Sequence, residues 1–422
     1  MKRILQLIVI GLLVFATTRD VVFAVETPTV GVIRFDAWDN SINPQVAPDY
    51  SKFGPQQWHY RLPFFTTWDS NGTPVLNGAS QGNVDKEIQI ADAAGISYFA
   101  FDYYPIIDWG WLINHQTTIN YGLRDYLAST VPSNVKFALI IVSDGGVLGD
   151  VTKWNTSQVP QIVNLMKNQK YQTVLDGRAL VYFFGADWTK YFGTKEAAKS
   201  ALTTLRQQIA AATGKNPYFV SMDYDTDVAY FEFDARSGYL GLSDFTAKGA
   251  SYQALTVSNL NYWNNLAQSG YQVIPLVSAG YDQRPRDPNY TGAGFQKGTA
   301  AEIAGNLQSA IQWIHTHPAI TTPNSILLYA WNENIEGGWV MPTLFDGDAR
   351  LEEIAKVIKG AYFTTPRFLG VDFTGDGNVD IYDYNILVSH FGKTGTNLAG
   401  DIDKNGKVDI FDYNSLVENF GK

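Results

Sequence analysis

The stretch Ile326-Leu-Leu-Tyr-Ala-Trp-Asn-Glu-Asn-Ile-Glu-Gly-Gly-Trp339 contains an apolar run that ends in two carboxyl side chains. A short apolar run of this kind predicts a buried strand, and Glu333 and Glu336 stand just past its end. Asn-Glu after a strand is also typical of a helix N-terminus, in which Glu336 would lie in the first turn and be favoured by the helix dipole. The stretch alone leaves both interpretations open, so the rest of the chain decides between them.

The segment from residue 30 to residue 361 alternates strand-like apolar runs with longer helical patterns, which is typical of β-α units around a parallel sheet. The expected helices cover residues 84–94, 159–167, 195–213, 254–269 and 300–317. The expected strands cover residues 30–36, 96–102, 136–143, 179–184, 217–222, 237–242, 272–278 and 325–331. Eight strands predict an α/β fold with a (β/α)8 TIM barrel, and a doubly wound open sheet is the alternative.

Polar and aromatic side chains gather at the ends of the expected strands, where barrel active sites form. Glycoside hydrolysis usually requires two carboxyl groups, and Glu333 and Glu336 are the candidate catalytic pair. Any single polar residue at a strand end is more often a cap or an ion pair, but many strand ends sharing this pattern favour a binding site. The expected substrate-binding residues are Trp38, Asp102, Tyr104, Asp144, Tyr182, Asp282, Arg284, Trp331, Asn332 and Trp339.

Five motifs occur in the order found in one known family: Ala93-Ala-Gly-Ile-Ser-Tyr-Phe-Ala-Phe-Asp102, Lys136-Phe-Ala-Leu, Tyr171 followed by Asp176-Gly-Arg178, Gly280-Tyr-Asp-Gln-Arg-Pro-Arg286 and Trp331-Asn-Glu-Asn-Ile-Glu-Gly337. Through them, most of residues 30–361 resembles the WbsX-like proteins. These are relatives of the glycoside hydrolase family 99 endo-α-mannosidases and endo-α-mannanases. The family often has Glu-Pro where this chain has Met341-Pro342, so one family carboxylate is missing.

The resemblance implies a retaining glycosidase that acts on an α-mannoside-like polysaccharide or oligosaccharide and needs no cofactor for catalysis. Glu336 would be the general acid and base, with a raised pKa. Glu333 would remain ionised and take the proton of the substrate 2-hydroxyl, so that this oxygen attacks C1. A glycosyltransferase and a non-catalytic carbohydrate-binding protein are the alternatives. The signal-like N-terminus argues against the first, and retention of both carboxyl groups argues against the second.

The C-terminal segment contains one unit twice, Asp372-Phe-Thr-Gly-Asp-Gly-Asn-Val-Asp-Ile-Tyr-Asp383 and Asp401-Ile-Asp-Lys-Asn-Gly-Lys-Val-Asp-Ile-Phe-Asp412. Oxygen side chains at loop positions 1, 3 and 5, Gly at position 6 and an acid at position 12 are typical of EF-hand-type loops, which bind Ca²⁺. Each loop precedes an apolar helical pattern. The sequence therefore predicts a small all-α, EF-hand-like module with two calcium sites.

The two units resemble a type I dockerin over residues 370–422, which implies a cohesin-bearing scaffold protein as partner. A calcium-stabilised tail without a partner is the alternative. The resemblance implies as calcium ligands Asp372, Thr374, Asp376, Asn378 and Asp383 in the first loop, and Asp401, Asp403, Asn405, Lys407 and Asp412 in the second, with Asn378 and Lys407 supplying backbone carbonyls. Positions 10 and 11 are Ile381-Tyr382 and Ile410-Phe411, which are bulkier than usual in the family, so the partner's identity does not carry over.

The N-terminus combines Met1-Lys-Arg with an apolar run too short to span a bilayer, which predicts a secretory signal peptide over residues 1–24. An uncleaved anchor is the alternative. We therefore expect a secreted protein, attached through a scaffold, with a barrel domain over residues 25–365 and no membrane span after signal removal. The formal net charge of −10 argues against a nucleic-acid partner. The chain has no Cys, which excludes disulfides and thiolate ligands.

Overall fold

The structure, a computed structural model, describes part of the 422-residue chain. The expected signal peptide and the site residues Trp38, Asp144 and Asp376 lie outside the described residues. The described residues are 27–36, 50–104, 120–142, 151–185, 188–222, 227–243, 246–360, 371–374, 378–395, 398–403 and 405–421.

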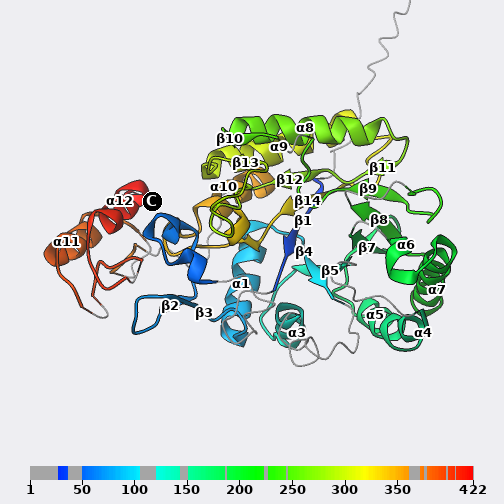
Figure 1. Cartoon of the computed structure of the whole chain (residues 1–422), viewed down its shortest axis with the longest axis horizontal. Helices are drawn as coiled ribbons and strands as arrows, with labels where there is room; N and C mark the ends of the chain where they lie inside the picture. The colour runs from blue at the N-terminus through cyan, green and yellow to red at the C-terminus, as the bar shows by residue number, and fades with distance from the viewer. Residues whose placement is uncertain are drawn as a thin grey trace, which may run out of the picture.

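A curled parallel sheet forms the centre of the molecule (Figure 1). Its strands follow the order β11-β9-β8-β7-β5-β4-β1-β14-β12, and every neighbouring pair on this path is parallel. The runs that form it are apolar almost without interruption, because both faces of such a sheet are buried. The strands are β1 (Thr29–Arg34), β4 (Tyr98–Tyr103), β5 (Lys136–Val142), β7 (Arg178–Phe184), β8 (Tyr218–Met222), β9 (Ala235–Ser237), β11 (Gln272–Val273), β12 (Leu276–Ser278) and β14 (Ser325–Tyr329).

The two edges of this sheet are the two halves of one expected strand, residues 272–278. β11 pairs with β9, β12 pairs with β14, and Pro275, which has no N–H to donate, lies between the halves. The Ile274 amide donates to the Arg236 carbonyl at 3.0 Å, and the Pro275 carbonyl accepts from the Leu327 amide at 3.0 Å. One segment therefore bonds to both ends of the sheet. This arrangement is consistent with the expected (β/α)8 barrel.

Helices pack around the outside of the sheet (Figure 1). Their starts follow local capping chemistry: the Thr194 and Ser251 hydroxyls accept backbone N–H bonds, and Thr299 forms a capping box with Glu302. All five expected helices occur within a few residues of their expected bounds. The helices of this part are α1 (Gln81–Ala94), α3 (Tyr121–Ala128), α4 (Val151–Lys153), α5 (Val159–Met166), α6 (Trp188–Phe192), α7 (Lys195–Thr213), α8 (Tyr252–Ala267), α9 (Ala300–Thr316) and α10 (Ala349–Lys359).

The sixth strand was placed wrongly by sequence. It was expected at residues 237–242, whereas β9 covers Ala235–Ser237 and pairs with β8 and β11. Beyond Ser237 the chain leaves the sheet, and Gly241 has a φ of +63°, a left-handed conformation that strands do not use. The aromatic side chain of Tyr239, which follows β9, consequently lies near the carboxyl ends of the strands and contacts Glu333.

Short strands and short helices lie outside the nine-strand path of the main sheet. The hairpin of β2 (Thr66–Trp68) with β3 (Pro74–Leu76) and the hairpin of β15 (Asn332–Glu333) with β16 (Gly338–Trp339) are antiparallel, as is β6 (Thr173–Val174) against β7. β10 (Lys248–Ala250) pairs with β13 (Gly294–Phe295) in parallel. Short 3-10 helices cover Tyr50–Phe53, Gln56–Arg61 and Asn334–Glu336, and a π-helix covers Trp154–Gln158.

The C-terminal segment folds around an apolar cluster of its own. It contains α11 (Ile381–His390) and α12 (Ile410–Asn419), which lie at the left of the molecule in Figure 1. The described residues of this cluster are Val371, Val379, Leu387, Ile402, Val408 and Leu416. We call residues 371–421 the C-terminal module.

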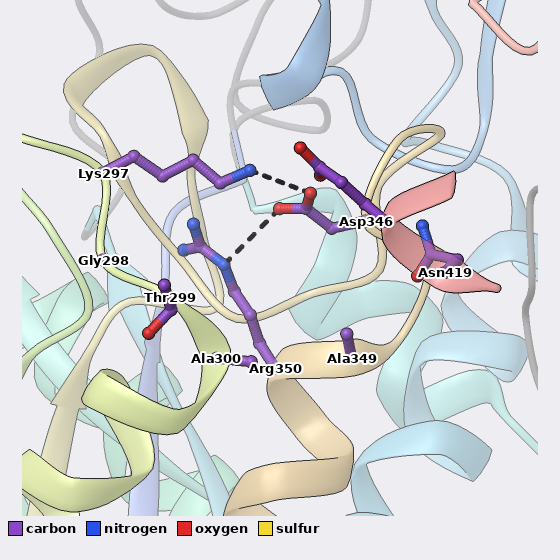
Figure 2. A pocket seen from close by; sticks show the side chains of 9 residues that line it. Lys297, Gly298, Thr299, Ala300, Asp346, Ala349, Arg350 and Asn419 are labelled. Atoms are coloured by element: carbon purple, nitrogen blue, oxygen red, sulfur yellow. Dashed lines mark hydrogen bonds and ion pairs between the residues drawn. The ribbon is translucent and has the colours of Figure 1, made fainter. Parts of the chain in front are cut away.

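Polar contacts between described residues join the module to the barrel. The His59 Nδ1 atom lies 3.1 Å from Asp403 Oδ2, and the Asn419 side-chain amide donates to the Phe345 carbonyl at 3.4 Å. A cavity of about 410 Å³ lies between α12 and the starts of α9 and α10, where Lys297 and Arg350 both face Asp346 (Figure 2). Across the described ranges, we find no helix with the length and apolarity needed to cross a membrane.

Candidate active site

Glu333 and Glu336 lie directly beyond the carboxyl end of β14, in the loop closed by the β15–β16 hairpin. Between the two hairpin strands the chain makes one 3-10 turn, which ends at Gly337 with a φ of +85°. A longer helix does not start here, so the strand interpretation of this stretch is confirmed. A Cβ at Gly338 would lie 2.2 Å from the Tyr329 ring, so glycine is needed for the loop to fold back over its own strand.

Glu333 is buried in an acidic, aromatic environment. The Tyr239 hydroxyl donates to Glu333 Oε1 at 3.1 Å and also lies 2.6 Å from Asp102 Oδ2. Burial, followed by the charges of Glu336 and Asp102, raises the pKa of Glu333 well above its usual value. Burial likewise raises the pKa of Asp102 to about 8, with smaller contributions from the charges of Asp36 and Glu336. The structure thus concentrates carboxyl groups where water cannot stabilise their charges.

Glu336 is more accessible and has a cationic partner. Its carboxylate forms an ion pair with Arg286 and accepts a hydrogen bond from the Tyr329 hydroxyl at 2.9 Å. The Tyr329 and Tyr239 rings are in edge-on contact, with centroids 5.4 Å apart. The two glutamates are therefore connected through two touching tyrosines, but they have opposite surroundings.

The surroundings of Glu333 differ from those expected. The resemblance implied that Glu333 remains ionised, whereas burial raises the pKa of its carboxyl group. Only one hydrogen-bond donor, the Tyr239 hydroxyl, is described for its side chain. One such bond does not offset the loss of hydration around a buried carboxylate.

A second loop, after β12, supports the Glu336 turn. The Asp282 amide donates to the Glu336 carbonyl at 2.6 Å, and a Cβ at Gly280 would lie 2.2 Å from the Gly337 carbonyl. Asp282 is ion-paired with Arg61 and with Arg284. Burial disfavours the Asp282 carboxylate, but the hydrogen bonds from Arg284 and the charge of Arg61 outweigh this and lower the pKa of Asp282. The expected residues Asp282 and Arg284 thus lie beside the glutamates, bonded to each other.

Three expected sugar-binding aromatic residues are core residues instead. Tyr182 is fully buried, and its hydroxyl bonds to that of Tyr98 at 2.7 Å, inside the barrel. Trp331 is fully buried and donates from Nε1 to Glu87 Oε1 at 3.1 Å, facing α1. Trp339 is buried under the guanidinium of Arg350, which lies 3.7 Å from its ring centroid. A strand residue points to one of two faces, and the rings of Tyr182 and Trp339 face the packed interior, as does the ring of Trp331 between β14 and β15.

Asn332 also differs from its expected role. Its side-chain amide pairs with the backbone of Phe35, donating to the carbonyl at 2.6 Å and accepting from the amide at 2.9 Å. It therefore joins the Glu333 loop to the residue that follows β1, and it is buried. Asp102 lies at the carboxyl end of β4 and Tyr104 follows the strand, and only Asp102 is joined by described hydrogen bonds to the Glu333 network.

Sequence reasoning overlooked two side chains that contact the glutamates, Tyr239 and Tyr329. Tyr329 stands in the decisive stretch itself, four residues before Glu333. Arg286 was expected, with Arg284, only as a group that binds sugar hydroxyls or steers a carboxylate. Tyr239 had no usable signal, because the misplaced sixth strand assigned it to the sheet.

The second repeat of the C-terminal module gathers three of its expected ligands. Carboxylate oxygens of Asp401, Asp403 and Asp412 lie within 4.8 Å of one another. Burial raises the pKa of Asp401 to about 6 and that of Asp412 to about 7. The Asn405 side-chain amide donates to Asp403 Oδ2 at 2.9 Å, so Asn405 lies in the same cluster, and the Lys407 amide donates to Asn405 Oδ1.

The first repeat is described less completely. Asp383 is fully buried, accepts the Phe373 and Thr374 amides on Oδ1 at 2.8 and 3.0 Å, and forms the capping box of α11 with Asp380. The Thr374 hydroxyl donates to Asp372 Oδ1 at 3.0 Å. Asn378 is exposed. The positions of these residues follow the loop pattern of the second repeat.

The fold is shared with proteins of known structure. One, described as a glycoside hydrolase-like protein, aligns with 80% of this chain and 95% of its own length, with a TM-score of 0.52 and 17% identity. Another, the GH99 endo-alpha-mannosidase from Bacteroides thetaiotaomicron, aligns with 78% of this chain and 96% of its own length, with a TM-score of 0.51 and 13% identity. No family profile and no curated protein sequence matches the chain. The chain therefore has the fold seen in these glycoside hydrolase structures.

Proposed function

We propose that this protein is a glycan-cleaving glycoside hydrolase whose catalytic pair is Glu333 and Glu336. The observation that carries the proposal is the position of both carboxyl groups on one loop at the carboxyl end of a parallel barrel, in opposite surroundings. Glycosidases need two carboxyl groups with different protonation behaviour. The shared fold with glycoside hydrolase structures supports the same function class.

The roles follow from the surroundings and from the resemblance to family 99. Glu333 is the base that removes the proton of the substrate 2-hydroxyl, and its raised pKa suits this role because a carboxylate with a higher pKa is a stronger base. Glu336 is the general acid and base at the leaving oxygen. Arg286 must release Glu336 before its carboxyl can donate a proton. The Arg286 side chain is 55% exposed, which leaves it room to move.

The finer proposal is a retaining enzyme that acts on an α-mannoside-like substrate without a cofactor. It is supported by the Trp-Asn-Glu-x-x-Glu-Gly motif and by a shared fold with a protein described as an endo-alpha-mannosidase. The loop of Asp282 and Arg284 borders the site, and we propose that it contacts sugar hydroxyls. Asp102 and Tyr104, and Trp38 and Asp144 outside the described residues, complete the proposed subsites.

We propose further that residues 25–365 form the catalytic domain and that the C-terminal module, within residues 370–422, is a type I dockerin that binds calcium and a cohesin-bearing scaffold. The clustered oxygens of Asp401, Asp403 and Asp412, with Asn405 beside them, fit a hard cation. Residues 1–24 would direct secretion, and the scaffold would then hold the enzyme outside the cell.

The exposed apolar side chains of the module support the proposal of a protein partner. Within the described residues, the exposed large apolar side chains are concentrated in the module, although it is a small part of the chain. They occur at matching positions of the two repeats, namely Ile381 and Ile410, Tyr382 and Phe411, Val388 and Val417, and Phe391 and Phe420. Apolar surface that recurs in this way is typical of a protein-binding face.

The test of the catalytic proposal is product release from a panel of polysaccharides weighted towards α-mannans. We expect Glu333→Gln and Glu336→Gln each to lower kcat by about 10²- to 10⁴-fold while sugar binding is retained. Glu353→Gln on α10, a glutamate paired with Lys356 outside the site, is the matched control and should keep parental turnover. NMR of the first-formed anomer tests retention. Sugar binding without cleavage by the parent protein would reject the hydrolase.

A further inference from the structure

Tyr239 bridges two carboxyl groups with a single hydroxyl proton. Its oxygen lies 2.6 Å from Asp102 Oδ2 and 3.1 Å from Glu333 Oε1. The ring is held in place by stacking on Phe184, with centroids 4.3 Å apart, and by the edge-on contact with Tyr329. The hydroxyl therefore cannot turn away from both acids at once.

Counting protons constrains the state of this cluster. If both carboxyl groups were ionised, the Tyr239 hydroxyl could donate to one of them only, and its lone pairs would face the other carboxylate at hydrogen-bond distance. A second proton removes this conflict. A protonated Asp102 donates to the Tyr239 oxygen, and the Tyr239 hydroxyl then donates to Glu333, so that each contact contains one proton.

The surroundings place the extra proton on Asp102. The side chain is 3% exposed, and its second oxygen, Oδ1, is buried without a hydrogen-bond partner among the described residues. Within the described residues, the charges that add to burial in raising the pKa of Asp102 come from Asp36, just after β1, and from Glu336, and Asp102 also repels the carboxylate of Glu333. Burial and the charges of Glu336 and Asp102 also raise the pKa of Glu333, but the Tyr239 hydrogen bond and the charge of Arg286 oppose this rise, and no cation is among the described groups that shift the pKa of Asp102. A buried carboxylate without cation or full hydrogen bonding is costly, so the neutral form is favoured at Asp102.

We propose that Asp102 is a protonated positioning residue which, through Tyr239, keeps a hydrogen-bond donor directed at the base Glu333. The proposal rests on the proposed function for the role of Glu333, but the protonation of Asp102 is independent of it. When Asp102 loses its proton at alkaline pH, the Tyr239 hydroxyl turns to the new anion. Glu333 then loses its donor and gains a neighbouring negative charge.

Infrared spectroscopy of the intact protein tests the protonation without any substrate. The carbonyl stretching band of a protonated carboxyl group is followed with pH in the parent, Asp102→Asn and Glu333→Gln proteins. Parent-minus-variant spectra isolate each group, because other buried acids such as Asp412 also have raised pKa values. We expect the band at neutral pH, its loss in Asp102→Asn and its persistence in Glu333→Gln. No band at neutral pH, or a band lost only in Glu333→Gln, would overturn the proposal.

The pH profile of turnover tests the positioning role. Asp102→Asn is permanently neutral and its amide can still donate to Tyr239, so we expect kcat/KM to fall less than about tenfold and the alkaline decline assigned to Asp102 to disappear. Tyr239→Phe should lower kcat by about tenfold or more. A loss in Asp102→Asn as large as in Glu333→Gln, or an unchanged alkaline decline, would contradict this role. If no polysaccharide is cleaved, the proposed function fails and the infrared result still decides the protonation.

Discussion

The barrel buries many of its large aromatic side chains, whereas the C-terminal module exposes some of its own. The barrel buries large aromatic residues such as Trp154, Trp263 and Trp331 completely, whereas the module exposes Tyr382 and Phe411 and, among its described residues, buries six apolar side chains. A small unit has too little interior to cover its own apolar surface. The difference shows which aromatic residues support the fold and which are available to a partner.

Buried acids show the same contrast. Asp102 in the barrel is contacted by a tyrosine hydroxyl and lies close to other acids, so its charge is best removed by a proton. In the module, Asp401 and Asp412 accept backbone amides in a cluster whose oxygens face one another. A cation can neutralise such a cluster. One region therefore raises pKa values for proposed acid-base chemistry, and the other does so where a metal is proposed to bind.

The largest effect is expected from a buried aromatic residue of the barrel. Trp331→Ala removes a fully buried ring and the hydrogen bond to Glu87, and it should lower the free energy of unfolding by about 3–5 kcal/mol. Trp331→Phe, which keeps a ring, should lose less. Urea unfolding followed by circular dichroism measures both. A loss below about 1 kcal/mol for the alanine variant would show that Trp331 is not a core residue.

Calcium removal should separate the two regions. A calcium concentration 100 times the dissociation constant stabilises a binding unit by about 2.7 kcal/mol, so chelation should increase hydrogen exchange in α11 and α12 and leave the barrel strands protected. A double variant, Asp401→Asn with Asp412→Asn, should lose the response of the second repeat. Equal loss of protection in the barrel would mean that the regions unfold as one unit.

The pH dependence of stability should reveal Asp102. Its pKa is about 8 in the folded protein, against 3.8 for an unperturbed aspartate, so between these values the folded state binds more protons than the unfolded state. The unfolding free energy contributed by this group is therefore greatest at low pH and falls as pH rises to about 8. Urea titrations of Asp102→Asn should show a shallower decline over this range than those of the parent. Identical slopes would contradict the raised pKa.

The smallest effect on stability is expected on the exposed face of the module. Tyr382→Ser and Phe411→Ser remove exposed rings, so each should change the unfolding free energy by no more than about 0.5 kcal/mol. Together they should weaken binding to a cohesin panel, measured by calorimetry in calcium. Leu416→Ala, in the module core, is the contrasting variant that should destabilise the module itself. Unchanged cohesin binding in the double variant would remove this face as the docking surface.

Local sequence patterns predicted most elements of this fold. Continuous apolar runs located seven of the eight strands, and helical periodicity with caps such as Thr299 located the helices. The position of Glu333 and Glu336 beyond a strand was also predictable, because an apolar run that stops at polar residues marks a strand end. These features depend on residues close together in the chain.

Side-chain direction and protonation depended on contacts between distant segments. Trp331 and Tyr182 are residue types that can bind sugars, but Tyr182 on β7 and Trp331 just beyond β14 both point into the core. Tyr239 reaches Glu333 only because the chain leaves the sheet after β9, and the raised pKa of Glu333 arises from burial among residues far apart in sequence. The sequence alone therefore determined the order of the elements and the candidate carboxyl pair. The tertiary structure decided which groups surround that pair, because burial and electrostatic interaction are properties of the assembled fold.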